Sequence, residues 1–144
     1  MLKGIPSILS PELLRVLMEM GHGDELVIGD GNFPAASNAQ RLLRSDGNMV
    51  PELLQAILQV FPLDTFVAKP VAVMAVVPGH NYSPTIWEEY RRIIKASGEP
   101  FSDFDYMERF AFYERARKAY AILASSETAL YANIILKKGV VAEK

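Results

Sequence analysis

Residues 20–34 read MGHGDELVIGDGNFP and place a short apolar run between two glycine-containing turns. The run at residues 25–28 is short and apolar enough to form a buried strand. Gly21 can end a helix before this strand, because glycine adopts the left-handed conformation that closes many helices. A helix end, a buried strand and a turn in succession indicate a fold in which helices and strands alternate.

Serine–proline pairs mark two helix starts on either side of this stretch. A serine side chain can accept hydrogen bonds from the free N–H groups of a first turn, and proline fits the first helical position. Ser10 and its following proline predict a helix up to Gly21. Ser83 and its following proline predict another up to Gly98. Further helices are predicted over residues 51 to about 60 and from about residue 109.

The clearest strand signal is VAVMAVV, residues 71–77. A continuous apolar run rich in β-branched residues is typical of a strand covered on both faces. All predicted strands together cover residues 25–28, 71–77, 103–107, 119–124 and 133–136. Because they alternate with helices, we predict an α/β fold, namely a single three-layer α/β/α domain over residues 1–144 with a mostly parallel central sheet.

The composition is that of an ordinary globular domain. Of the 144 residues, 50% are apolar and 22% are charged, which excludes the low-hydrophobicity signature of disorder. The 15 basic and 17 acidic residues are spread along the chain, so we expect no electropositive field for nucleic acid. No apolar run approaches the roughly 20 residues that span a bilayer, and we expect no membrane segment.

Cysteine usage bears on the cellular compartment. The chain has no cysteine, which excludes disulfides, thiolate metal sites and cysteine nucleophiles. This suits a reducing compartment, and the amino-terminal segment lacks the sustained apolar stretch of a secretion signal. We therefore expect a cytoplasmic protein.

His22 and Asp30 are the first candidate site residues, one on each side of the strand at residues 25–28. Histidine exchanges protons near neutral pH, and the flanking glycines leave the His22 ring approachable. The alternative is a histidine that only satisfies a helix C-terminus. Asp30 follows a buried strand, where α/β sheets present ligand-binding groups. Its alternative is an Asx turn that merely accepts backbone hydrogen bonds.

Three further polar residues follow later in the chain. Arg109 begins the run RFAFYERARK, although most charges of this kind lie on the solvated face of a helix. Tyr131 and Asn133 stand just before a strand, where a phenol and a carboxamide could face one pocket, or could be a rim aromatic and a turn residue. Metal ligands with recognisable spacing and phosphate-binding glycine motifs are both missing from the sequence.

Four segments together resemble the L-fucose mutarotases, which share a superfamily with the ribose pyranases. They are SPELLRVLMEMGHGDELVIGDGNFPA, LLQAILQVFPLD, ERFAFYERARKAYAI and YANIILKKGV, and they occur in the same order over nearly the whole chain. The resemblance implies an enzyme that interconverts the anomers of a reducing sugar without cofactor or metal. It assigns proton transfer to His22, sugar binding to Asp30 and Arg109, and closure on the sugar to Tyr131, Ala132 and Asn133.

The resemblance also implies a ring-shaped homo-oligomer, commonly a decamer of two pentamers, with sites near subunit contacts. Two residues depart from the pattern, since many relatives have histidine in place of Asn32 and glycine in place of Ala132. These changes bear on sugar preference. The sequence itself adds a crowded aromatic segment that could serve either a subunit interface or the internal core, namely Phe101, Phe104, Phe110 and Phe112.

The chemistry of mutarotation suits these residues. One proton must leave the anomeric hydroxyl while another reaches the ring oxygen, and an imidazole can perform either transfer near neutral pH. We therefore predict an isomerase that acts on L-fucose, with a sugar approaching His22 and Asp30 fixed across from it. The alternatives are a ribose pyranase, a noncatalytic sugar-binding or regulatory protein, and an α/β scaffold for an unrelated partner.

Overall fold

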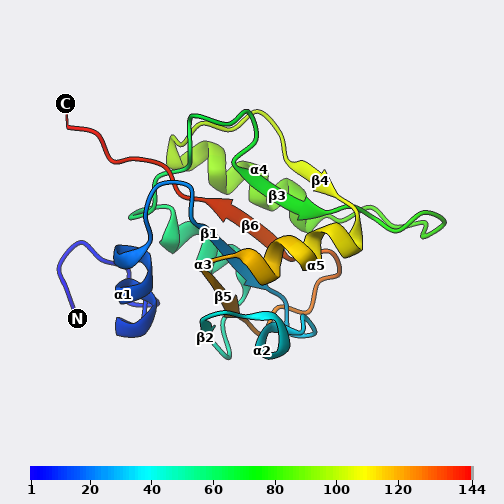
Figure 1. Ribbon diagram of the computed structural model, residues 1–144, viewed down its shortest axis with the longest axis horizontal. Helices are drawn as coiled ribbons and strands as arrows, with labels where there is room; N and C mark the ends of the chain where they lie inside the picture. Colours follow the sequence, from blue (N-terminus) through cyan, green and yellow to red (C-terminus); the bar gives the residue numbers. More distant parts are fainter. Residues whose placement is uncertain (144) are drawn as a thin grey trace.

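A six-stranded sheet forms the centre of the computed structural model, which describes residues 1–143 (Figure 1). Its strand order is β2-β5-β1-β6-β3-β4. The strands are β1 (Glu25–Gly29), β2 (Leu42–Arg44), β3 (Val71–Met74), β4 (Asp105–Met107), β5 (Ala121–Ala124) and β6 (Ile134–Lys137). The helices are α1 (Pro11–Glu19), α2 (Ala35–Asn38), α3 (Val50–Ile57), α4 (Ile86–Ser97) and α5 (Arg109–Lys118).

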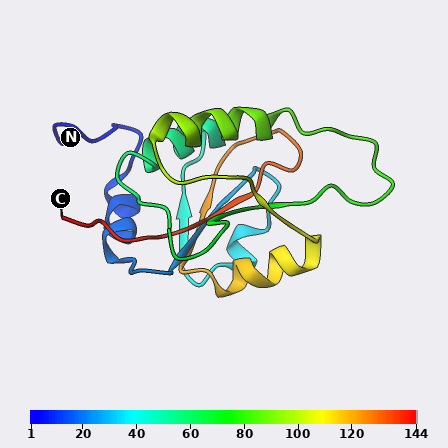
Figure 2. The same cartoon turned by 90° about the horizontal axis from the view of Figure 1, so that it is seen from above.

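Side chains of the central strands alternate between two apolar cores. Along β1, Leu26 and Ile28 pack with residues of α1, α3 and α4 on one face of the sheet. Val27 packs on the other face with residues of α2 and α5. Figure 2 shows α3 and α4 on one side of the sheet and α2 and α5 on the other. The predicted three-layer α/β/α arrangement is therefore confirmed.

Strand β6 runs against its neighbours in the middle of the sheet. Three strand pairings are parallel, namely β1 with β5, β2 with β5, and β3 with β4. Strand β6 is antiparallel to both β1 and β3. Only residues 125–133 connect β5 to β6, which is too short for the crossover that a parallel strand requires. The sheet is thus mostly parallel as predicted, with one reversed central strand.

The predicted start of α1 is confirmed, whereas its predicted end is wrong. The Ser10 side chain accepts a hydrogen bond from the Leu13 N–H at 3.1 Å, so the predicted cap is confirmed. The prediction that Gly21 ends the helix is wrong, because α1 ends at Glu19 and Met20 already has extended backbone. A lysine that is distant in sequence binds the chain just after this helix end instead, since Lys138 Nζ donates a hydrogen bond to the Met20 carbonyl at 2.5 Å.

Helix α4 also differs from its prediction at one end. It begins at Ile86 after Thr85, so Ser83 does not cap it. Gly98 does end it, with a left-handed φ of 79° that disfavours side chains. The short elements α2 and β2 were not predicted, because four and three residues are too few to show a hydrophobic period.

Several strand bounds differ from their predictions. Strand β3 ends at Met74 rather than at residue 77, β4 starts at Asp105 rather than at 103, and β5 starts at Ala121 rather than at 119. The aromatic segment is divided between core and surface: Phe104 and Phe112 are fully buried, whereas Phe110 is 70% exposed. Within residues 1–143, no helix has the length and apolar character needed to cross a membrane.

Candidate sugar-binding site

The reversed direction of β6 brings distant polar residues to one edge of the sheet. Strands β1 and β3 end at this edge and β6 begins there, since Ile134 pairs with Ile28 of β1 and with Val73 of β3. Asp30 follows β1, and Asn133 precedes β6. The carboxyl ends of parallel strands are the usual place for ligand binding in α/β sheets.

A cavity of about 240 Å³ opens at this edge. Its size lies just below the roughly 300–1,000 Å³ of sites for drug-sized ligands, so it suits a smaller molecule. Polar side chains line it together with a few apolar ones, as in sites that orient a polar ligand. The polar lining residues are Asp30, Asn32, His80, Arg109, Tyr113, Tyr131 and Asn133, and the apolar ones are Phe33, Met74, Val77 and Leu130.

Larger hollows of about 640 and 560 Å³ lie elsewhere, and neither contains any of the site residues predicted from the sequence. One of about 640 Å³ lies between the amino-terminal segment and α1, and its lining is mainly apolar with Arg15 as its charged residue. The meeting of four sequence-predicted site residues at the carboxyl ends of strands, rather than volume, identifies the cavity at the sheet edge as the candidate site.

Asp30 is held at the cavity by hydrogen bonds from its backbone N–H and to its carboxylate. Its N–H donates to Asn133 Oδ1 at 2.8 Å, and its carboxylate accepts the N–H of Asn32 at 2.9 Å. Asp30 therefore forms the Asx turn that the sequence offered as an alternative, and it also lines the cavity. Burial raises the pKa of Asp30, and the negative charge of Glu127 acts in the same direction against backbone hydrogen bonds from Asn32 and Phe33.

Tyr131 has an unusual backbone conformation, a φ of 59°, in a residue other than glycine. Such conformations cost about 1–3 kcal/mol and persist where the surrounding structure enforces them, often at functional sites. Here the Trp87 indole N–H donates to the Tyr131 carbonyl at 2.9 Å. The Tyr131 hydroxyl in turn accepts the Val77 N–H at 3.3 Å and bonds to His80 Nδ1 at 2.6 Å. These contacts fix the phenol at the cavity wall.

Ala132 does not line the cavity. It is fully buried, and its carbonyl accepts a hydrogen bond from the Tyr90 hydroxyl at 2.7 Å. Burial raises the pKa of Tyr90, so this phenol stays a donor. Of the two departures noted in the sequence, Asn32 therefore falls in the cavity and Ala132 in the core.

Arg109 and Tyr113 line the cavity from the first two turns of α5. The Arg109 guanidinium lies 5.5 Å from the centroid of the Tyr113 ring, within the range of a cation–π contact. Arg115 from the same run does not join them. It pairs with Glu25 through hydrogen bonds of 3.1 Å and with Asp105 at 3.3 Å.

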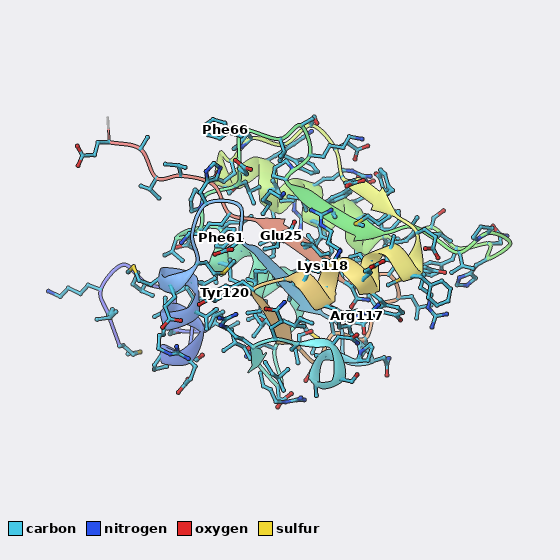
Figure 3. All side chains as sticks on the ribbon, in the orientation of Figure 1. Glu25, Phe61, Phe66, Arg117, Lys118 and Tyr120 are labelled. Carbon is cyan, nitrogen blue, oxygen red and sulfur yellow. The ribbon has the colours of Figure 1, made fainter. Side chains whose placement is uncertain are left out.

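His22 lies at the opposite edge of the sheet. It precedes β1 whereas Asp30 follows it, and five strand residues separate the two edges by about 13 Å. The His22 ring lies 5.0 Å from that of Phe66, which Figure 3 shows at the end of the sheet away from the β3–α4 loop. The expectation that one chain places Asp30 directly across from His22 is therefore wrong.

His22 has a buried carboxylate partner. Its Nε2 lies 2.9 Å from Asp64 Oδ1, and the Asp64 side chain is only 4% exposed. Burial acts to raise the pKa of Asp64, but hydrogen bonds from the Phe66 N–H and His22, with the nearby charge of Lys137, lower it overall. An ionised Asp64 accepts from Nε2–H, which leaves Nδ1 of a neutral His22 ring as the free proton acceptor.

Sequence reasoning missed the roles of Asp64 and His80. Asp64 gave no signal beyond its place in the FPLD segment, because its partner His22 is distant in sequence. His80 likewise gave no signal, because its partner Tyr131 lies 51 positions further along the chain. Within residues 1–143, no cluster of three or more histidine, cysteine or acidic residues could hold a metal ion.

The fold and the cavity define a small α/β protein with a polar pocket for a small ligand at a sheet edge. Residues 3–141 match the family described as the RbsD / FucU transport protein family. The chain belongs to this family, and the predicted membership is confirmed.

Named relatives match over essentially the full chain. Fucose mutarotase of Bos taurus is 51% identical over 149 residues, which cover 99% of this chain and 96% of the relative. L-fucose mutarotase of Actinobacillus pleuropneumoniae serotype 5b is 48% identical over 144 residues, which cover 100% of both chains.

Solved structures agree with the sequence relatives. The fucose mutarotase of Streptococcus pneumoniae in complex with L-fucose matches with a TM-score of 0.93 and 53% identity, covering 98% of this chain and 100% of that one. RbsD of Bacillus subtilis complexed with D-ribose matches with a TM-score of 0.72 and 20% identity, covering 99% of this chain and 100% of that one. The second likeness is one of fold alone.

Proposed function

We propose that this protein is a mutarotase that interconverts the α and β anomers of L-fucose. The observation that carries the proposal is the cavity at the sheet edge, where carboxylate, carboxamide, phenol and guanidinium groups converge in a chain about half identical to fucose mutarotases over its full length. These groups supply the directional hydrogen bonds that hold a polar sugar.

The proposed reaction needs two proton transfers. A base removes the proton of the anomeric hydroxyl, an acid protonates the ring oxygen, and the bond from the anomeric carbon to the ring oxygen breaks. After rotation of the open-chain carbonyl, the reverse transfers close the other anomer. His22 is the proposed proton-transferring residue, acting through Nδ1 while Asp64 holds Nε2. Each positioned acid or base typically contributes 10²–10⁴-fold.

We further propose that two chains build each site. The His22 side chain is 42% exposed beside Phe66, a residue that is 78% exposed, while exposed Val77 and Leu130 line the cavity at the other edge and exposed Phe110 follows Arg109. Two different apolar surfaces on one chain can associate head to tail, and such contacts close into rings. A neighbour's His22 would then reach the cavity. The homo-oligomer implied by the family resemblance, a decamer, satisfies this requirement.

The proposed activity is directly measurable. Magnetisation-transfer NMR on L-fucose at anomeric equilibrium should show exchange between the two anomers that rises in proportion to protein concentration. D-ribose in the same experiment tests the ribose pyranase alternative. Sugar binding without exchange would establish the noncatalytic alternative, and no effect on L-fucose, D-ribose or their epimers would refute the proposal.

The cellular location belongs to the same proposal. We place the reaction in the cytoplasm, a reducing compartment that suits a chain without cysteine. The proposed partner is the monosaccharide itself, held without cofactor or metal.

Replacing Asp30 with asparagine should weaken sugar binding about 10- to 100-fold, because a hydrogen bond to a charged group contributes about 1.5–3 kcal/mol. Stability should not fall. Since the pKa of Asp30 is raised on folding, ionising it at neutral pH costs folding free energy, and this cost disappears as pH falls through that pKa. Calorimetric titration and thermal unfolding of Asp30→Asn at pH 7 measure both effects.

Protonation of Asp30 should weaken sugar binding as the pH is lowered. Because the pKa of Asp30 is raised, wild-type sugar affinity should begin to fall at a higher pH than it would with an ordinary aspartate, whose pKa is about 3.9. The exposed Asp46, which pairs with Arg44, provides the matched control. Asp46→Asn should leave sugar affinity unchanged. Unaltered affinity in Asp30→Asn would remove Asp30 from the proposed site.

A further inference from the structure

The cavity contains an imidazole that the proposed mechanism has not used. His80 lines it together with Asp30, Tyr131 and Asn133. The chain has two histidines, and His22 lies at the other edge of the sheet. His80 belongs to the loop of residues 75–85 between β3 and α4, which extends beyond the sheet in Figures 1 and 2.

His80 is bonded directly to the Tyr131 phenol. The distance from His80 Nδ1 to Tyr131 Oη is 2.6 Å, and the Val77 N–H donates to the same oxygen at 3.3 Å. The turn around His80 is fixed by its own backbone, since the His80 N–H donates to the Val77 carbonyl at 3.0 Å. The ring therefore stays beside the phenol.

Tyr82 completes a stack of three rings. Its ring lies 5.5 Å from that of His80 with an interplanar angle of 14°, and 5.8 Å from that of Tyr131 with an angle of 29°. An aromatic face against an imidazole can also accommodate a charged imidazolium. The titratable groups that face His80 are thus Tyr131 and Tyr82, and Asp30, Arg109 and Tyr113 share its cavity.

A count of donors and acceptors shows what His80 can do to Tyr131. A phenol has one O–H donor and two acceptor positions. When imidazolium Nδ1–H and the Val77 N–H fill both acceptor positions, the Tyr131 O–H is left to donate into the cavity. When His80 is neutral with its proton on Nε2, Nδ1 accepts the Tyr131 O–H instead. The protonation state and the tautomer of His80 therefore decide together whether Tyr131 donates to a ligand.

We propose that His80 is a proton-relay partner of Tyr131 and that the pair is the second acid–base group of the site. This inference rests on the proposed mutarotase function. In ring opening, Tyr131 gives its proton to the sugar ring oxygen and receives the Nδ1 proton of the His80 imidazolium. The anomeric hydroxyl proton passes to His22, and the bond between anomeric carbon and ring oxygen breaks. Closure reverses each transfer, so His80 and His22 regain their starting states.

The test compares two substitutions at His80. Glutamine keeps a polar side chain but cannot titrate, and alanine removes the contact. Both variants should exchange anomers about 100-fold more slowly at saturating sugar, because a positioned acid or base contributes at least this much. KM should change little. His80→Gln should lose one limb of the wild-type pH profile, and His22→Gln should lose the other. Asn81→Ala, an exposed change in the same loop, should behave as wild type.

Two further measurements test whether His80 acts through Tyr131. Adding His80→Gln to Tyr131→Phe should slow exchange no further than Tyr131→Phe alone, because both changes break one relay. The ¹⁵N resonance of His80 Nδ1 should move in Tyr131→Phe, a readout that needs no activity.

The outcomes distinguish this inference from the proposed function. If the wild-type protein exchanges no anomers, the function fails and the relay fails with it. If the wild-type protein is active and His80→Gln keeps both its rate and its pH profile, only the relay is overturned. An unmoved Nδ1 resonance in Tyr131→Phe would also overturn it.

Discussion

His22→Ala should lower anomer exchange by about 10²–10⁴-fold at saturating L-fucose, because a positioned general acid or base contributes this much. Sugar affinity should stay within about tenfold of wild type, since the groups of the cavity at the other sheet edge remain. Magnetisation-transfer NMR gives the rate, and calorimetric titration gives the affinity.

His22→Gln serves as the matched control for charge and packing. It keeps a polar side chain beside the buried Asp64 carboxylate but cannot exchange protons near neutral pH. It should be as slow as His22→Ala and should lack the limb of the pH profile that His22 provides. If either variant keeps the wild-type rate, another residue transfers this proton.

A mixture of two inactive variants should recover activity if neighbouring chains share each site. In a homo-oligomer assembled from equal amounts of His22→Ala and Asp30→Asn, half of the histidines and half of the cavities are intact. Random pairing then gives intact sites at about one quarter of the wild-type number. Each variant alone should be nearly inactive at low sugar concentration.

The reciprocal mixture is the control. The double variant His22→Ala/Asp30→Asn is co-assembled with wild-type chains, and shared sites again leave about one quarter intact, whereas self-contained sites leave about one half. Light scattering on the same samples gives the oligomer mass. A mass near 16.0 kDa with full activity, or no recovery in the first mixture, would refute the shared site.

Sequence alone determined the local features that depend on near neighbours. The Ser10 cap, the left-handed end at Gly98 and the buried strand after His22 follow from bonds and conformations within a few residues. Family membership also followed from the sequence, because four motifs keep their order along the chain. Asp30, Arg109, Tyr131 and Asn133 were all predicted as site residues, and all line one cavity.

Only the tertiary structure decided how these elements are arranged around the site. The reversal of β6 places Asn133 beside Asp30 and puts Lys138 at the far edge, where it holds the end of α1 before His22. No local pattern encodes a strand direction, because an apolar strand buried on both faces looks the same in either orientation.

The pairings of His22 with Asp64 and of His80 with Tyr131 were likewise beyond the sequence. His22 and Asp64 are 42 positions apart in the sequence, and His80 and Tyr131 are 51 positions apart. Both pairs meet through loops whose paths are set by the packed sheet. The sequence determined which chemical groups this protein has, since their identities and local turns are written along the chain. The tertiary structure decided which groups meet, because contacts between distant residues form only when the whole core packs.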